Sequence, residues 1–195
     1  MGKVLAFITM SLDGFVAGPN DRIGTGLGDG GEELHTWMFG EPTGEPDEVD
    51  EAYRVDTFSS GGAWLVGRTM HDLAEGWGDE PGFGVPVYVV THRPHETVVK
   101  GDTTFEFVTG GIEAALERAR AAAGDKNVIV MGGADLLRQY LAAGLVDELR
   151  LTIAPMLLGS GKRLFDGIER TDISFERTAV VESPYATHLR YEVRV

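Results

Sequence analysis

Residues 63–69, Ala-Trp-Leu-Val-Gly-Arg-Thr, and residues 128–134, Val-Ile-Val-Met-Gly-Gly-Ala, decide the fold class of this chain. Each stretch is a short apolar run that meets a glycine turn and then enters a helical pattern. Helices are predicted over Thr69–Trp77 after the first turn and over Ala134–Ala143 after the second. Strands that alternate with helices in this way are typical of a parallel sheet with crossover helices. The sequence therefore predicts an α/β fold.

The rest of the chain extends this sheet and adds an antiparallel edge. Further strands are predicted where apolar runs meet turn residues, at Val4–Met10, Val85–Val90, Thr103–Val108 and Glu148–Ala154. Further helices are predicted at Glu32–Phe39, at Ile112–Ala123, and from a cap at Asp47 to about Phe58, after a break at Pro42–Pro46. Ser174–Val181 and Thr187–Val195 alternate around a turn and predict a β-hairpin. With no repeat or linker, residues 1–195 are predicted to form a single domain with a mixed, mostly parallel sheet and flanking helices.

The composition excludes several classes of protein. The chain has 195 residues, of which 43% are hydrophobic and 25% charged, as in a globular domain. It has no cysteine, which excludes disulfides, thiolate metal sites and cysteine nucleophiles, and no metal site is predicted. The net charge of −14 argues against a nucleic-acid surface. The N-terminal apolar run is too short to cross a membrane and lacks a cleavage pattern, so a cytoplasmic protein is predicted.

Two of the strand-to-helix turns carry residues suited to a phosphate. In Gly67-Arg68-Thr69, the glycine allows close approach to the backbone, Arg68 supplies a forked cation, and Thr69 can cap the helix. Gly132-Gly133-Ala134 offers backbone N–H groups at a positive helix end. Glycines also serve simple tight turns, so either turn alone is weak evidence. Thr91-His92-Arg93 adds cations at the end of a third strand, and the three together favour a nucleotide.

Two other glycine strings do not fit their motifs. Residues 26–31 satisfy G-x-G-x-x-G, but a loop rather than a strand precedes them, so we interpret them as a flexible flap. Residues 159–163, Gly-Ser-Gly-Lys-Arg, fail as a P-loop because the motif needs a Gly at Met156 and a Ser or Thr at Arg163. These strings therefore predict no phosphate site.

The motifs in combination resemble the dihydrofolate reductase-like superfamily. The resemblance is carried by Ser11-Leu12-Asp13-Gly14, by the two phosphate turns, and by the block from Gly144 to Phe165. The Ser11 motif and that block look like the reductase domain of riboflavin-biosynthesis deaminase-reductases (the RibD C-terminal domain) and its stand-alone relatives. The resemblance covers nearly the whole chain. It implies NADPH across the carboxyl ends of the strands, hydride transfer to a bound substrate, and a homodimer.

The resemblance also implies roles for individual residues. Phosphate and adenosine contacts are implied for Gly67, Arg68, Thr69, Thr91, His92, Arg93, Gly132, Gly133, Ala134 and Leu136. Ala17 and Gly18 would lie near the nicotinamide, and Gly161 would close the other side. Phe7 stands where the riboflavin enzymes have a Lys, which argues against a phosphoribosyl substrate. Asp13 is a candidate to orient substrate or relay a proton, although Asp-Gly is also simply a good turn.

Trp37 is a candidate wall of the substrate pocket, although an aromatic residue on a short helix is more often core.

The leading hypothesis is an NADPH-dependent reductase that transfers hydride to a small heterocyclic (pterin- or pyrimidine-like) or carbonyl substrate. The alternative is a non-catalytic NADPH-binding sensor or interaction module that keeps the same cleft. NADPH titration followed by a turnover assay separates the two.

Overall fold

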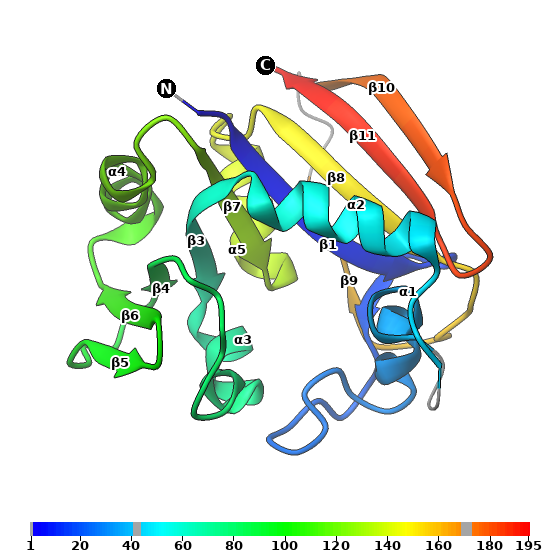
Figure 1. The fold of residues 1–195 in the computed structure, drawn as a ribbon, viewed down its shortest axis with the longest axis horizontal. Coiled ribbons are helices and arrows are strands. Elements are labelled where there is room, and N and C mark those ends of the chain that lie inside the picture. Colours follow the sequence, from blue (N-terminus) through cyan, green and yellow to red (C-terminus); the bar gives the residue numbers. More distant parts are fainter. Residues whose placement is uncertain (1, 41–43, 169–172) are drawn as a thin grey trace.

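A single large sheet organises the protein in a computed structural model, which describes residues 2–40, 44–168 and 173–195. Within these residues nine strands lie in the order β10-β11-β8-β1-β7-β3-β4-β6-β5 (Figure 1). Six neighbouring strands are parallel: β8 (Glu148–Ala154), β1 (Val4–Ser11), β7 (Asn127–Gly132), β3 (Gly61–Gly67), β4 (Val87–Val90) and β6 (Thr103–Val108). The predicted α/β fold with a mostly parallel sheet is confirmed.

Antiparallel strands complete both edges of the sheet. β11 (Thr187–Arg194) pairs with β8, and β10 (Ser174–Glu182) pairs with β11, as the predicted hairpin requires. At the other edge, β5 (Val98–Lys100) pairs with β6 and was not predicted. A separate two-stranded ribbon, β2 (Phe15–Ala17) with β9 (Lys162–Arg163), was also not predicted, because its strands are only three and two residues long.

Helices cover both faces of the sheet, which gives it two hydrophobic cores. α4 (Gly111–Ala123) and α5 (Ala134–Ala142) pack on the face that carries Val4, Ala6 and Ile8 of β1. Because side chains alternate along a strand, Leu5 and Phe7 point to the opposite face. There they pack with residues of α1 (Thr36–Phe39), which follows the short helix η1 (Gly31–His35), and of the longer α2 (Glu48–Ser59), which lies across the sheet in Figure 1.

The predicted ends of α2 and α4 are largely confirmed. The Asp47 side chain accepts a hydrogen bond from the Val49 N–H at 2.9 Å and caps α2, and α4 ends at Gly124 with φ of 62°. The predicted break at Pro42–Pro46 is partly outside the described residues, since 42 and 43 are not among them. The predicted helix over Glu32–Phe39 is divided into η1 and α1.

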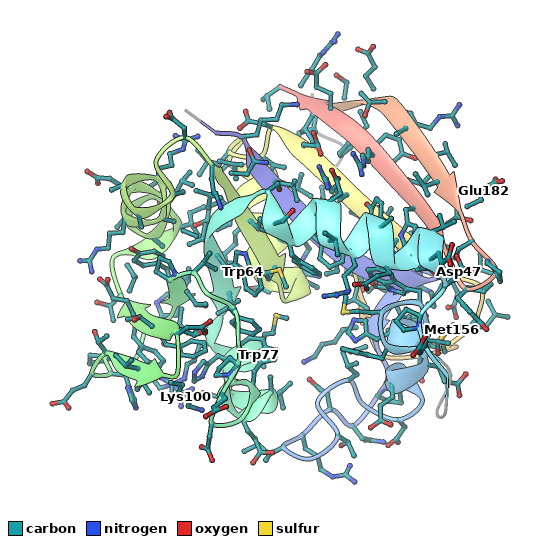
Figure 2. All side chains as sticks on the ribbon, in the orientation of Figure 1. Asp47, Trp64, Trp77, Lys100, Met156 and Glu182 are labelled. Carbon is teal, nitrogen blue, oxygen red and sulfur yellow. The ribbon has the colours of Figure 1, made fainter. Side chains whose placement is uncertain are left out.

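The predicted helix over Thr69–Trp77 is wrong in its second half. α3 (Arg68–Leu73) ends early, and a separate turn η2 (Glu75–Trp77) follows, with positive φ at Glu75 and Trp77. The ammonium of Lys100 explains the change, because it donates to the carbonyl oxygens of Glu75, Gly76 and Gly78 at 3.2, 3.4 and 2.7 Å. Figure 2 shows Trp77 and Lys100 close together on this side of the molecule. A strand 25 residues away thus competes with the helix for these carbonyls.

Candidate active site

The strand register brings the two predicted phosphate turns to one edge of the sheet. Val66 is level with Gly132, and Gly67 is level with Val90, which is itself level with Val108. A Cβ placed on Gly67 would lie 3.6 Å from the Gly133 nitrogen and 3.7 Å from the Gly132 oxygen. The two turns are therefore in direct contact at the carboxyl edge of the parallel strands, where α/β folds bind their ligands.

The second turn leads into α5 and leaves the start of that helix open. Gly133 is the N-cap residue and provides no side-chain hydrogen bond to the helix. The first N–H groups of a helix have no partner within it, and the helix dipole makes this end attractive to anions. Ala134 and Leu136 are buried, so they can reach a ligand through backbone atoms rather than side chains. The Gly132–Gly133 peptide bond is cis.

Two glycines in these turns have no role that the fold itself requires. Gly67 has φ of −77° and Gly133 has φ of −69°, and both values are ordinary for any residue. A Cβ on Gly67 would make only ordinary contacts, and one on Gly133 would meet nothing within 4 Å. Gly132 differs, since its φ of 113° favours glycine. The missing side chain of Gly133 leaves bare backbone facing open space, as a site for close backbone approach to a ligand would, and the missing side chain of Gly67 lets the first turn lie against the second.

Cations gather beside the first turn, around a single carboxylate. Asp72 of α3 accepts hydrogen bonds from Arg68 Nε at 2.6 Å and from Arg93 Nη2 at 3.1 Å, and Arg93 comes from the loop after β4. The Arg68 guanidinium also lies 5.2 Å from the ring centre of Phe107. Burial alone would raise the pKa of Asp72, but hydrogen bonds from Arg68 and His71 outweigh it and hold that pKa below its usual value. Asp72 is therefore ionised at neutral pH.

Three residues of this region for which cofactor contacts were predicted, Thr69, Thr91 and His92, lie in different environments. Thr69 does not cap α3, because Gly67 is the N-cap residue; Thr69 lies inside the helix, with its side chain exposed. Thr91 is buried, and its hydroxyl oxygen accepts a hydrogen bond from the Arg93 N–H at 3.0 Å, so it shapes the turn. His92 is exposed. Among the residues predicted to contact the adenosine end, Arg68 and Arg93 supply the charged donors that meet at Asp72.

Ala17, Gly18 and Gly161 form a second backbone contact. Gly161 lies so close to β2 that a Cβ on it would be 2.0 Å from the Ala17 oxygen and 2.8 Å from the Gly18 carbonyl carbon. Its φ of 130° also favours glycine. The ribbon of β2 and β9 holds these residues in place, and Arg138 of α5 donates to the Arg163 oxygen at 3.0 Å. This ribbon is thereby joined to the helix that begins at the Gly132-Gly133 turn.

Asp13 joins the loop after β1 to the loop after β8. Its carboxylate accepts hydrogen bonds from the Ser11 hydroxyl at 2.5 Å, from the Leu158 N–H at 3.1 Å and from the Gly159 N–H at 2.7 Å. The Ser11 bond in particular, with help from the two backbone bonds, lowers the pKa of Asp13 to about 2. A carboxyl group with this pKa has no proton to give at neutral pH. Asp13 is therefore an ionised carboxylate that holds the two loops together.

The segment after Gly18 connects the two sides of this edge. The Gly18 N–H donates to the Leu27 oxygen at 2.8 Å and the Asp29 N–H donates to the Pro19 oxygen at 2.8 Å, so residues 18–29 fold back on themselves. A Cβ on Gly26 would lie 3.0 Å from the Leu73 oxygen, which places the loop against the end of α3. Residues 26–30 of the G-x-G-x-x-G string are thus part of a loop, as predicted, and Gly31 begins η1; this loop extends from β2 toward α3 in Figure 1.

Phe7 and Trp37 do not line an open pocket in this structure. They are 4% and 1% exposed, their ring centres are 6.1 Å apart, and they belong to the core beneath α1 and α2. The Trp37 indole N–H donates to the Thr9 hydroxyl oxygen at 3.2 Å. Both side chains are therefore part of the core in this structure, which agrees with the interpretation of Trp37 as a core aromatic residue.

A fully buried pair of titratable groups lies in the same core. His188 Nε2 is 2.7 Å from Asp50 Oδ1, and His188 Nδ1 is 2.9 Å from the Thr152 hydroxyl. The imidazole stacks on Tyr53 at 3.9 Å. Burial lowers the pKa of His188, against the opposing effect of Asp50. This pair was not predicted, because its members are 138 residues apart; a histidine at an inward-facing position of a strand was a signal that could have indicated it.

Within the described parts of the chain, no group of three or more His, Cys, Asp or Glu side chains is arranged to hold a metal ion. The helices described there are also too short or too polar to cross a membrane.

The sheet order and the turns at its carboxyl edge define a dihydrofolate reductase-like fold. A putative riboflavin biosynthesis protein from Shewanella sp. PV-4 superposes with a TM-score of 0.73 and 22% identity, over 99% of both chains. Dihydrofolate reductase from Enterococcus faecalis, in complex with NADP(H), superposes with a TM-score of 0.57 and 16% identity, over 100% of this chain and 98% of that one.

The RibD C-terminal domain model matches residues 2–183, so the chain belongs to that family. The uncharacterized protein YyaP of Bacillus subtilis is 25% identical over 193 residues, which cover 93% of this chain and 90% of YyaP. The resemblance stated from the sequence motifs is confirmed.

Proposed function

We propose that this protein is an NADPH-dependent reductase that transfers hydride to a small heterocyclic or carbonyl substrate. The observation that carries the proposal is the contact between the Gly67 turn and the Gly132-Gly133 turn, in which neither φ nor steric crowding requires a glycine at position 67 or 133. They expose backbone beside the open start of α5, where a pyrophosphate would gain both N–H donors and the helix dipole. The likeness to a reductase that binds NADP(H) supports the same reading of this edge.

The residues present fit the whole length of such a cofactor. Gly67, Gly132, Gly133 and Ala134 would hold the pyrophosphate through their backbone. Arg68 and Arg93 would bind the 2′-phosphate, because a guanidinium is a strong donor to phosphate oxygens. Ala17, Gly18 and Gly161 would flank the nicotinamide, on the ribbon that Arg138 joins to α5.

The protein would position the reactants and exclude water from them, whereas NADPH would supply the hydride when it is bound. Asp13 holds the 156–159 loop against the Ser11 turn, and Gly161 in turn packs on Ala17 and Gly18. The loop of residues 18–29 lies between β2 and α3, where it would exclude water from the reacting atoms.

The alternative is an NADPH-binding module without turnover. The observation in its favour is the close packing of Phe7 and Trp37, which fill the space beneath α1. Binding of NADPH without its oxidation in the presence of pterin, pyrimidine and carbonyl substrates would select this alternative.

The experiment that tests the proposal is a fluorescence titration of Arg68→Ala with NADPH. Loss of a charged hydrogen bond to phosphate costs about 1.5–3 kcal/mol, so Kd should rise by roughly ten- to a hundredfold. Arg118→Ala is the matched control, because Arg118 is also paired with a carboxylate, Glu106, but lies on α4 away from the glycine turns. Unchanged NADPH affinity in Arg68→Ala, or an equal loss in Arg118→Ala, would contradict the proposed cofactor site.

A further inference from the structure

Asp72 is the shared partner of three basic side chains at the adenosine end of the proposed cofactor site. It accepts from Arg68 at 2.6 Å and from Arg93 at 3.1 Å, and it lies 3.3 Å from His71 Nδ1. The Arg68–Asp72 contact follows from helical spacing, since residues four apart lie on one face of a helix. The Arg93–Asp72 contact does not follow from helical spacing, because the two residues are 21 positions apart in the sequence. Two elements therefore converge on one carboxylate.

This carboxylate remains within reach of a ligand. The Asp72 side chain is 33% exposed, compared with 21% for Arg68 and 70% for Arg93. Asp72 contacts Arg68 through Nε alone, so the terminal nitrogen atoms of that guanidinium remain available as donors. Burial lowers the pKa of His71, which leaves that ring neutral, so the cluster carries two positive charges and one negative charge. A ligand at this position meets donors and an ionised acceptor side by side.

The arginines and the carboxylate of this cluster favour different cofactors. An arginine accommodates the 2′-phosphate of NADP(H), whereas a carboxylate accepts a hydrogen bond from the free 2′-hydroxyl of NAD(H) and repels the phosphate. We infer that Asp72 is a specificity-determining residue that admits NADH to this site, so that the protein uses both dinucleotides. This inference rests on the proposed function, because it concerns the same site.

The test is the pair of dissociation constants for NADPH and NADH, measured by fluorescence on the full chain with Asp72→Asn. The wild-type dissociation constants for NADPH and NADH should differ by less than about tenfold, because one site offers partners both to the 2′-phosphate and to the 2′-hydroxyl. In Asp72→Asn, NADPH should bind several-fold more tightly and NADH several-fold more weakly. The preference for NADPH should therefore rise by about tenfold or more, the factor expected when one charged hydrogen bond is lost.

Two further variants separate this role from a structural one. Asp72→Glu keeps the charge and should retain NADH binding. Glu51→Gln removes a carboxylate that pairs with Arg54 at 2.6 Å on α2, and it should leave both constants unchanged. An equal loss for both dinucleotides in Asp72→Asn would overturn the inference, since it would show that Asp72 only orients Arg68.

A wild-type preference for NADPH above about a hundredfold, or an unchanged ratio in Asp72→Asn, would also overturn it while leaving the proposed function intact. If wild type binds neither dinucleotide, the proposed function fails together with the inference.

Discussion

Replacement of Gly133 by alanine should affect the proposed cofactor site while leaving the fold intact. The backbone at this position already has φ of −69°, and the added methyl group would meet no atom within 4 Å. Alanine is a poorer N-cap than glycine by up to about 1 kcal/mol, whereas the loss of glycine from the unfolded chain contributes about 0.4–1 kcal/mol in the opposite direction. The free energy of unfolding should therefore change by less than about 1 kcal/mol.

The effect on NADPH should be much larger. The methyl group would stand in the open space at the start of α5, where the pyrophosphate is proposed to approach the backbone. Loss of even one charged hydrogen bond from these N–H groups costs about 1.5–3 kcal/mol, which raises Kd by at least about tenfold. Gly133→Ala should thus remain folded and bind NADPH poorly.

Urea unfolding and calorimetric titration measure the two quantities on the same preparation. A folded Gly133→Ala protein with wild-type NADPH affinity would refute the assignment of this turn to the pyrophosphate. Destabilisation by more than about 2 kcal/mol would refute the reasoning about open space, since a change of that size signals a clash or a lost backbone contact.

The remaining predictions concern the Gly161 contact and the buried histidine. Gly161→Ala should lower the free energy of unfolding, measured with urea, by about 1–3 kcal/mol more than Gly159→Ala does. Both residues have positive φ, but of the two only Gly161 lies close to the Ala17 oxygen. Equal losses of stability in the two variants would contradict this close packing. Since burial lowers the pKa of His188 below 6.5, the unfolded chain binds a proton before the folded one does. Stability should therefore fall as pH drops below about 6.5, and His188→Gln should reduce that slope in unfolding experiments across pH; an unchanged slope would show that His188 does not contribute.

Local sequence patterns predicted the elements that carry the cofactor side of the site. A strand, a glycine turn and a helix are recognisable within about ten residues, and parallel strands place their ends at one edge whatever the rest of the chain does. The convergence of Gly67 on Gly132-Gly133 follows from that rule. The cap at Asp47 was predicted on the same local basis.

The substrate side could not be predicted because its contacts are long-range. Asp13 finds its partners 145 and 146 residues away, and no local pattern distinguishes that arrangement from an Asp-Gly turn. Trp37 is suited both to a pocket wall and to a core, and only its packing against Phe7 and His188 decides for the core. The small-molecule substrate, the homodimer and the cytoplasmic location stay predictions.

The position of β1 in the middle of the sheet has a consequence for biosynthesis. β1 is synthesised before its two neighbours, β7 and β8, which begin at Asn127 and Glu148. The apolar run from Val4 to Ile8 therefore lacks its neighbouring strands until most of the chain has been synthesised. Exposed apolar segments of this kind invite aggregation, and long-range pairing slows folding. A chain interrupted before Asn127 would carry an unpaired central strand, so we expect the yield of intact protein to depend on chaperones that shield β1.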